Sequence, residues 1–189
     1  MVMRKEKIYM FEQILDDVDR ALEAKAYYAA LNLALTIPDI CGKAMYDDVS
    51  SRKRYTRWYN EYIEYYSELR GLPKDYPTFN GSAIYKLRCA MLHQGSLSLD
   101  DDRAYCNNGN PPGNIDKFEI EINDEGLYLT MACEEYGPDG NRIRLYRTSV
   151  NTICMLLTRA ARACYRENKE KFGFMEGEFI YVDGVTEDV

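Results

Sequence analysis

Residues 82–95 read Ser-Ala-Ile-Tyr-Lys-Leu-Arg-Cys-Ala-Met-Leu-His-Gln-Gly and carry the most specific pattern in the chain. Their apolar positions recur at the spacing of one helix face, which predicts a packed helix that ends near Gly95. Outward from this stretch, the same spacing predicts helices over residues 4–24, 26–43, 52–69 and 149–171. The chain is therefore expected to be mainly α, with a helical bundle at its centre.

Two of these helices have distinctive features. Pro38 lies inside the second and should kink or split it, because a proline removes a helical hydrogen bond. The third carries an aromatic stripe, which is more often core or dimer interface than a surface that stacks bases. The stripe comprises Tyr55, Trp58, Tyr59, Tyr62, Tyr65 and Tyr66. Because it offers more aromatic surface than one face of a small bundle needs, we expect a homodimer.

The pattern between the last two helices is different. Residues 117–147 alternate apolar and polar positions, with turn residues at 123–126 and 137–140, which predicts a small antiparallel β-meander inserted into the bundle. Before it, residues 96–116 are rich in Asn, Gly and Pro and predict a flexible loop. The loop follows His93, so it is either a mobile flap over that residue or a tolerated insertion. Residues 179–182 could add one short strand.

Length and composition limit the class of protein. At 189 residues with 46% hydrophobic content, one folded domain over residues 1–189 is expected. No apolar run is long enough to span a membrane, and the first residues do not resemble a signal peptide, so we expect a cytoplasmic protein. The six cysteines are scattered and there is one histidine, so reduced structural thiols, no metal site and no cofactor are expected.

Charge restricts a role in nucleic-acid binding. The net charge of −7 disfavours general binding of phosphate backbones. The only dense basic cluster is Arg52, Lys53, Arg54 and Arg57, at the start of the third predicted helix. It is either a footing for RNA phosphates or a set of ion-pair partners for Asp47, Asp48 and Glu61, and both interpretations stay open.

His93 and Arg88 are the residues suited to chemistry in residues 82–95. Imidazole exchanges protons near neutral pH, and a guanidinium holds phosphate with two donors. Five positions on a regular helix turn the two side chains about 140° apart, so they converge only if the helix loosens near His93. The alternative is a structural histidine stabilised by the helix dipole at a C-terminus.

The segment Arg88-Cys-Ala-Met-Leu-His93 resembles the Arg-x4-6-His signature of HEPN domains (higher eukaryotes and prokaryotes nucleotide-binding). Residues 30–35, 37–41 and 85–95 are similar to small bacterial proteins related to that superfamily, and the resemblance covers roughly residues 10–95. It implies a HEPN-like helical bundle. It also implies a metal-independent endoribonuclease or RNA-associated protein of a bacterial or phage defence system, with two Arg/His pairs facing one cleft in a homodimer.

The resemblance also implies residue roles. His93 would act as general acid or base at the RNA 2′-hydroxyl or leaving oxygen, and Arg88 would bind the scissile phosphate. Apart from the resemblance, Gln94 and the basic cluster Arg52, Lys53, Arg54 and Arg57 are the candidate substrate-binding residues. Active members often have a polar residue directly after the arginine, where this chain has Cys89. The alternative is therefore a non-catalytic HEPN-like dimeric module that binds a partner protein or nucleotide, or a dimeric scaffold.

Overall fold

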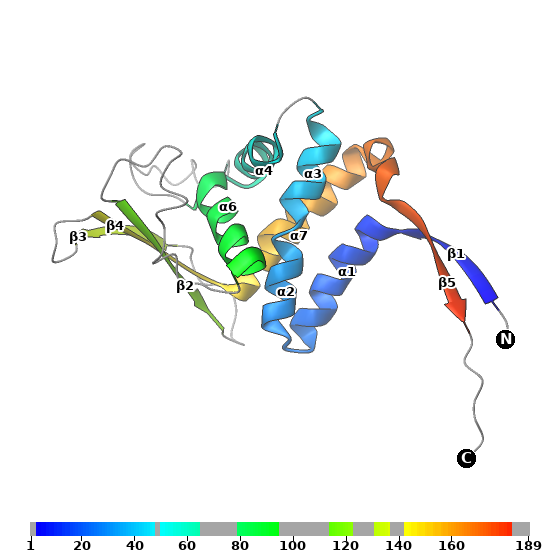
Figure 1. The fold of residues 1–189 in the computed structure, drawn as a ribbon, viewed down its shortest axis with the longest axis horizontal. Coiled ribbons are helices and arrows are strands. Elements are labelled where there is room, and N and C mark those ends of the chain that lie inside the picture. Colours follow the sequence, from blue (N-terminus) through cyan, green and yellow to red (C-terminus); the bar gives the residue numbers. More distant parts are fainter. Residues whose placement is uncertain are drawn as a thin grey trace, which may run out of the picture.

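A helical bundle forms the centre of the computed structural model, with a small sheet at one end and a two-stranded ribbon at the other (Figure 1). The structure describes residues 3–47, 50–64, 79–94, 114–122, 131–136 and 142–182. The prediction of a mainly α protein with a small β-insertion is confirmed. None of the described helices is long and apolar enough to cross a membrane.

The bundle is built around α7 (Val150–Glu167), which contacts α1 (Met10–Glu23), α2 (Tyr27–Ala34) and α3 (Ile37–Met45). A short 3-10 helix, η3 (Lys169–Met175), follows α7. The prediction for Pro38 is confirmed, because the helix expected over residues 26–43 is split into α2 and α3, with Pro38 in the first turn of α3. The side chain of Ser149 accepts a hydrogen bond from the backbone N–H of Thr152 and caps the start of α7.

Two shorter helices complete the bundle, and each ends in a π-helical turn. Helix α4 (Ser51–Tyr59) continues into η1 (Asn60–Glu64). Helix α6 (Gly81–Cys89) continues into η2 (Ala90–Gln94), close to the end expected at Gly95. The side chain of Asn80 accepts hydrogen bonds from the backbone of Ser82 and Ala83 at 3.0 Å, which fixes where α6 begins.

Tyr55, Trp58 and Tyr59 of the aromatic stripe are part of the core, and the partly buried Tyr62 packs against it. Tyr55 and Trp58 have no exposed surface, and Tyr59 is also buried. The indole N–H of Trp58 donates to the thiol of Cys164 on α7 at 3.5 Å. Tyr65 and Tyr66 lie outside the described residues. The expectation that the stripe provides a surplus surface for dimerisation is therefore wrong for these three residues, because they fill the interior of their own bundle.

The strands differ from the expected antiparallel meander. The sheet contains β2 (Asn114–Glu121), β4 (Arg142–Ser149) and β3 (Met131–Tyr136) in that order, and β2 runs parallel to β4. Alternation of apolar and polar residues predicts which face is buried, but it does not predict which strands are neighbours. The parallel register places three complementary pairs side by side, and these explain the pairing. The pairs are Asp116 with Arg144, Phe118 with Tyr146, and Glu119 with Arg147.

Two further boundaries were wrong. Residues 4–9, expected to begin the first helix, belong to β1 (Met3–Tyr9), because this segment pairs antiparallel with β5 (Glu176–Val182). The strand expected at residues 179–182 is thereby confirmed, in a longer form. Of the expected loop over residues 96–116, positions 114–116 belong to β2, and the others lie outside the described residues, as do the two predicted turns.

Asp116 anchors the sheet to the bundle. Its carboxylate is 2% exposed and pairs with Lys86 on α6 and with Nε of Arg144 on β4 at 2.6 Å. A buried carboxylate is tolerated only when its charge is compensated, so these two cations hold β2 in place.

We expect Asp116→Ala to lower the free energy of unfolding by about 2–4 kcal/mol, because it leaves two partly buried cations without their shared partner. Glu119→Ala is the matched control on the same strand. Its ion pair with Arg147, at 2.5 Å, is exposed, so the loss should be less than about 1 kcal/mol. Urea denaturation of both variants measures the difference, and equal losses would contradict the anchoring role of Asp116.

Candidate functional site

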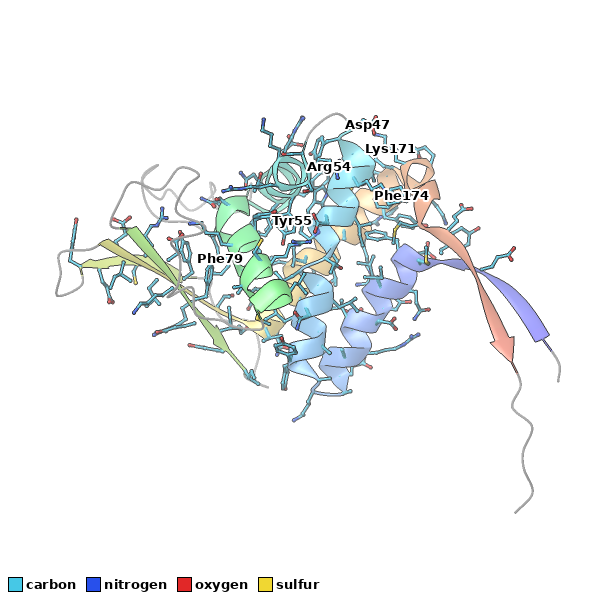
Figure 2. All side chains as sticks on the ribbon, viewed as in Figure 1. Asp47, Arg54, Tyr55, Phe79, Lys171 and Phe174 are labelled. Carbon is cyan, nitrogen blue, oxygen red and sulfur yellow. The ribbon has the colours of Figure 1, made fainter. Side chains whose placement is uncertain are left out.

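An open cleft of about 460 Å³ lies where α3, α4, α6 and η3 meet. Its lining contains three cationic side chains, one carboxylate and two aromatic rings, which are Lys43, Arg54, Arg88, Asp39, Tyr85 and Phe174. Figure 2 shows Arg54 and Tyr55 on α4 and Phe174 on the segment that follows α7. A cleft with a positive formal charge in a chain of net charge −7 is a local exception to the overall electrostatics.

Two glycines set the positions of the helices around the cleft. A Cβ added at Gly42 on α3 would lie 2.9 Å from the backbone of Arg54 on α4. A Cβ added at Gly81 on α6 would lie 2.4 Å from the carbonyl oxygen of Thr56, also on α4. The backbone N–H of Gly81 donates to the side chain of Asn60 at 2.6 Å. Helix α4 is therefore held in close contact with both neighbours, and this contact positions Arg54 at the cleft.

Arg88 on α6 forms the central ion pair of the cleft. Its Nη2 lies 2.6 Å from Oδ2 of Asp39 on α3. The guanidinium also lies 5.8 Å from the ring centre of Tyr85 and 5.9 Å from that of Tyr55. The Nε of Arg88 is buried and has no hydrogen-bond partner among the described residues. Arg88 is held in place by Asp39, and its side chain is 20% exposed, so its terminal nitrogens are the donors that a ligand in the cleft can reach.

The charges at the cleft interact with one another. Burial raises the pKa of Asp39 above its ordinary value, and the neighbouring Arg88 and Arg54 partly offset this by stabilising the carboxylate. Burial by itself lowers the pKa of Arg88, but the attractions of Asp39, Tyr55 and Cys89 together outweigh it, so the net direction of the pKa is upward. Lys43 lies over the ring of Phe174, with Nζ 4.2 Å from the ring centre.

The residues predicted from the sequence do not all gather here. Arg88 and Arg54 line the cleft, and the guanidinium of Arg52 lies 5.7 Å from the ring centre of Tyr85. Lys53 is exposed outside the lining. Arg57 pairs instead with Glu61 at 2.7 Å, as the ion-pair interpretation of the basic cluster expected for that residue.

His93 and Gln94 lie in η2 by their backbone, and their side chains are outside the described residues. A π-helical turn bonds each N–H to the carbonyl five residues earlier, so residues five apart lie about one turn apart. This is the loosening of the helix that convergence of Arg88 and His93 would need, although the turn covers only residues 90–94.

Sequence reasoning missed the four other charged or aromatic residues of the cleft, which are Asp39, Lys43, Tyr85 and Phe174. Asp39 and Lys43 stand four positions apart, which places both on one face of α3. That spacing could have predicted that the two charged side chains lie close together. Nothing in the spacing relates Phe174, more than 130 positions away, to either of them.

Comparisons of the chain with family models, with curated proteins and with solved structures found no match. Among the described residues, no three His, Cys, Asp or Glu side chains are grouped as a metal site. The chemical character of the cleft therefore rests on its own residues.

We expect Gly42→Ala to destabilise the protein by about 1–3 kcal/mol, because the added methyl group forces α3 and α4 apart at Arg54. Gly173→Ala is the control, since an added Cβ there has no atom within 4 Å and should change stability by less than about 0.5 kcal/mol. Thermal and urea denaturation measure both. If Gly42→Ala is as stable as Gly173→Ala, α3 and α4 can move apart without loss of stability, which would contradict the close packing proposed for Gly42.

Proposed function

We propose that this protein binds the phosphate backbone of single-stranded RNA in the cleft between α3, α4, α6 and η3. The observation that carries the proposal is the convergence of Lys43, Arg54 and Arg88 on one cleft of an acidic chain. Guanidinium groups suit phosphate because their donors match its oxygens in pairs. The resemblance of Arg88-x4-His93 to the HEPN signature points to the same ligand, and the implied role in defence is part of this proposal.

The aromatic residues of the cleft support a single strand over a duplex. Proteins read single-stranded RNA by stacking its bases on aromatic rings. Tyr85 and Phe174 lie in the lining with the cations, so a phosphate and an adjacent base can be bound together. Lys43 over Phe174, and Arg52 beside Tyr85, add positive charge next to each ring.

Arg88→Lys should weaken binding of a short single-stranded RNA by about tenfold, because an ammonium cannot make the paired contacts of a guanidinium with phosphate. Arg57→Lys is the matched control, since Arg57 pairs with Glu61 and does not line the cleft. Fluorescence anisotropy at fixed ionic strength measures both affinities. Equal affinities for the two variants would exclude Arg88 as a phosphate ligand.

A second candidate, metal-independent RNA cleavage, is favoured by the π-helical turn at residues 90–94. In this proposal His93 removes the proton of the 2′-hydroxyl, the 2′-oxygen attacks the adjacent phosphorus, and the bond to the 5′-oxygen breaks. The 5′-oxygen takes a proton from water, and the protonated imidazole of His93 replaces that proton. Arg88 neutralises the charge that develops on the phosphate. The products carry a 2′,3′-cyclic phosphate and a 5′-hydroxyl end.

Wild-type protein should then cleave single-stranded RNA in the presence of EDTA, and His93→Ala should lose about 10²–10⁴ in rate while remaining folded. Gel analysis of product ends and circular dichroism of both proteins provide the readouts. Activity that persists equally in His93→Ala would identify a contaminating nuclease and exclude this mechanism.

The ion pair between Arg88 and Asp39 favours the alternative of a non-catalytic module that binds a partner protein or nucleotide. In that case the pair serves to tie α6 to α3. Arg88→Lys would then lower stability without changing RNA affinity, so the same variant distinguishes the two proposals.

A further inference from the structure

The ribbon of β1 and β5 projects from the helical bundle (Figure 1). Each strand has seven residues, so the ribbon extends for roughly 23 Å. Apart from each other, its strands contact mainly α1, at the base of the ribbon, where Gly177 lies beside the side chain of Met10. A two-stranded ribbon is marginally stable in water by itself, so a third strand or a packing surface is needed to stabilise it.

The two outer edges of the ribbon differ in sequence. Strand β1 reads Met-Arg-Lys-Glu-Lys-Ile-Tyr, and four of its seven residues are charged. Strand β5 reads Glu-Gly-Glu-Phe-Ile-Tyr-Val, and its second half, residues 179–182, has no charge. Lysines on an edge strand oppose pairing with another strand, whereas an uncharged β-prone edge favours it. Within the described residues, neither edge is paired with a further strand.

We propose that β5 pairs antiparallel with β5 of a second copy of this chain, about a two-fold axis near Ile180. The product is a four-stranded sheet in the order β1-β5-β5-β1. In a two-fold dimer, each edge pairs with the same edge of the second copy. The edge that forms the interface must therefore be compatible with itself, and the two edges differ in this respect.

Pairing through β5 brings uncharged residues together. About an axis at Ile180, Phe179 is opposite the partner's Tyr181, and aromatic cross-strand pairs stabilise a sheet. Pairing through β1 about Lys5 or Glu6 would bring identical charges face to face, which is destabilising. In the proposed sheet the charged β1 strands form the outer edges, where their lysines oppose further growth.

This dimer does not depend on RNA binding. It does bear on the cleft, because β5 begins directly after Met175, which lines the cleft through η3. A second copy bound at β5 is therefore joined to the cleft by a continuous segment of backbone.

The test is cysteine cross-linking of the full chain, with light scattering of the wild type. Light scattering at tens of micromolar should give the mass of a dimer. Ile180→Cys should form a disulfide-linked dimer on mild oxidation, since opposed residues in an antiparallel pair are about 4.5–5.5 Å apart. Lys5→Cys is the matched control, because Lys5 is the register partner of Ile180 on β1 and would lie at the outer edge. It should give no dimer above the wild-type background from native cysteines.

Ile180→Lys provides a second variant. It introduces a like charge at the axis, so the dimer dissociation constant should rise more than about tenfold while the far-ultraviolet circular dichroism stays unchanged. A monomeric wild type would overturn the proposal. So would a dimer that cross-links through position 5 instead of 180, or through neither position, since either result would place the interface elsewhere.

Discussion

The close approach of α4 to α3 and α6 is the constraint on which the rest of the bundle depends. At Gly42 and Gly81 there is no room for a Cβ against the backbone of α4. Because α4 is fixed on both sides, Tyr55 and Trp58 are fully enclosed, and Arg54 borders the cleft from the same helix. The position of α4 thus sets both the core packing and the charge of the cleft. A shift of this helix would open the interior and at the same time move Arg54.

Asp39 gives the cleft its electrostatic balance. Three cations around a cavity repel one another, and a half-buried carboxylate among them reduces that repulsion before any ligand arrives. The same carboxylate competes with an incoming phosphate for Arg88. An RNA phosphodiester carries the same single negative charge as the Asp39 carboxylate, so it competes for Arg88 only with the added attraction of Lys43 and Arg54. The cleft therefore suits an anionic group that contacts several of its cations at once.

The sequence predicted elements well where the signal is local. The break at Pro38 and the uncharged strand at residues 179–182 each follow from a few adjacent residues, and both are confirmed. The predictions that failed concern contacts between residues far apart in the sequence. The parallel pairing of β2 with β4 depends on matches such as Asp116 with Arg144, 28 positions apart. At the site, Arg88 and Arg54 were identified by charge, but Asp39 and Phe174 join them only through tertiary packing.

The expected homodimer illustrates the same limit, because its premise was a surplus apolar surface on the aromatic stripe. Tyr55, Trp58 and Tyr59 of that stripe are instead buried in the core of one chain, and Tyr62 packs against it. The ribbon was not revealed by any helical pattern, since residues 4–9 were expected to begin a helix and form a strand by pairing with β5. The pairing between β1 and β5 fixes the register of the two edges that face each other. Each strand keeps one outer edge whose backbone donors and acceptors can recruit a second chain, and the charges of β1 favour the edge of β5 in our proposal.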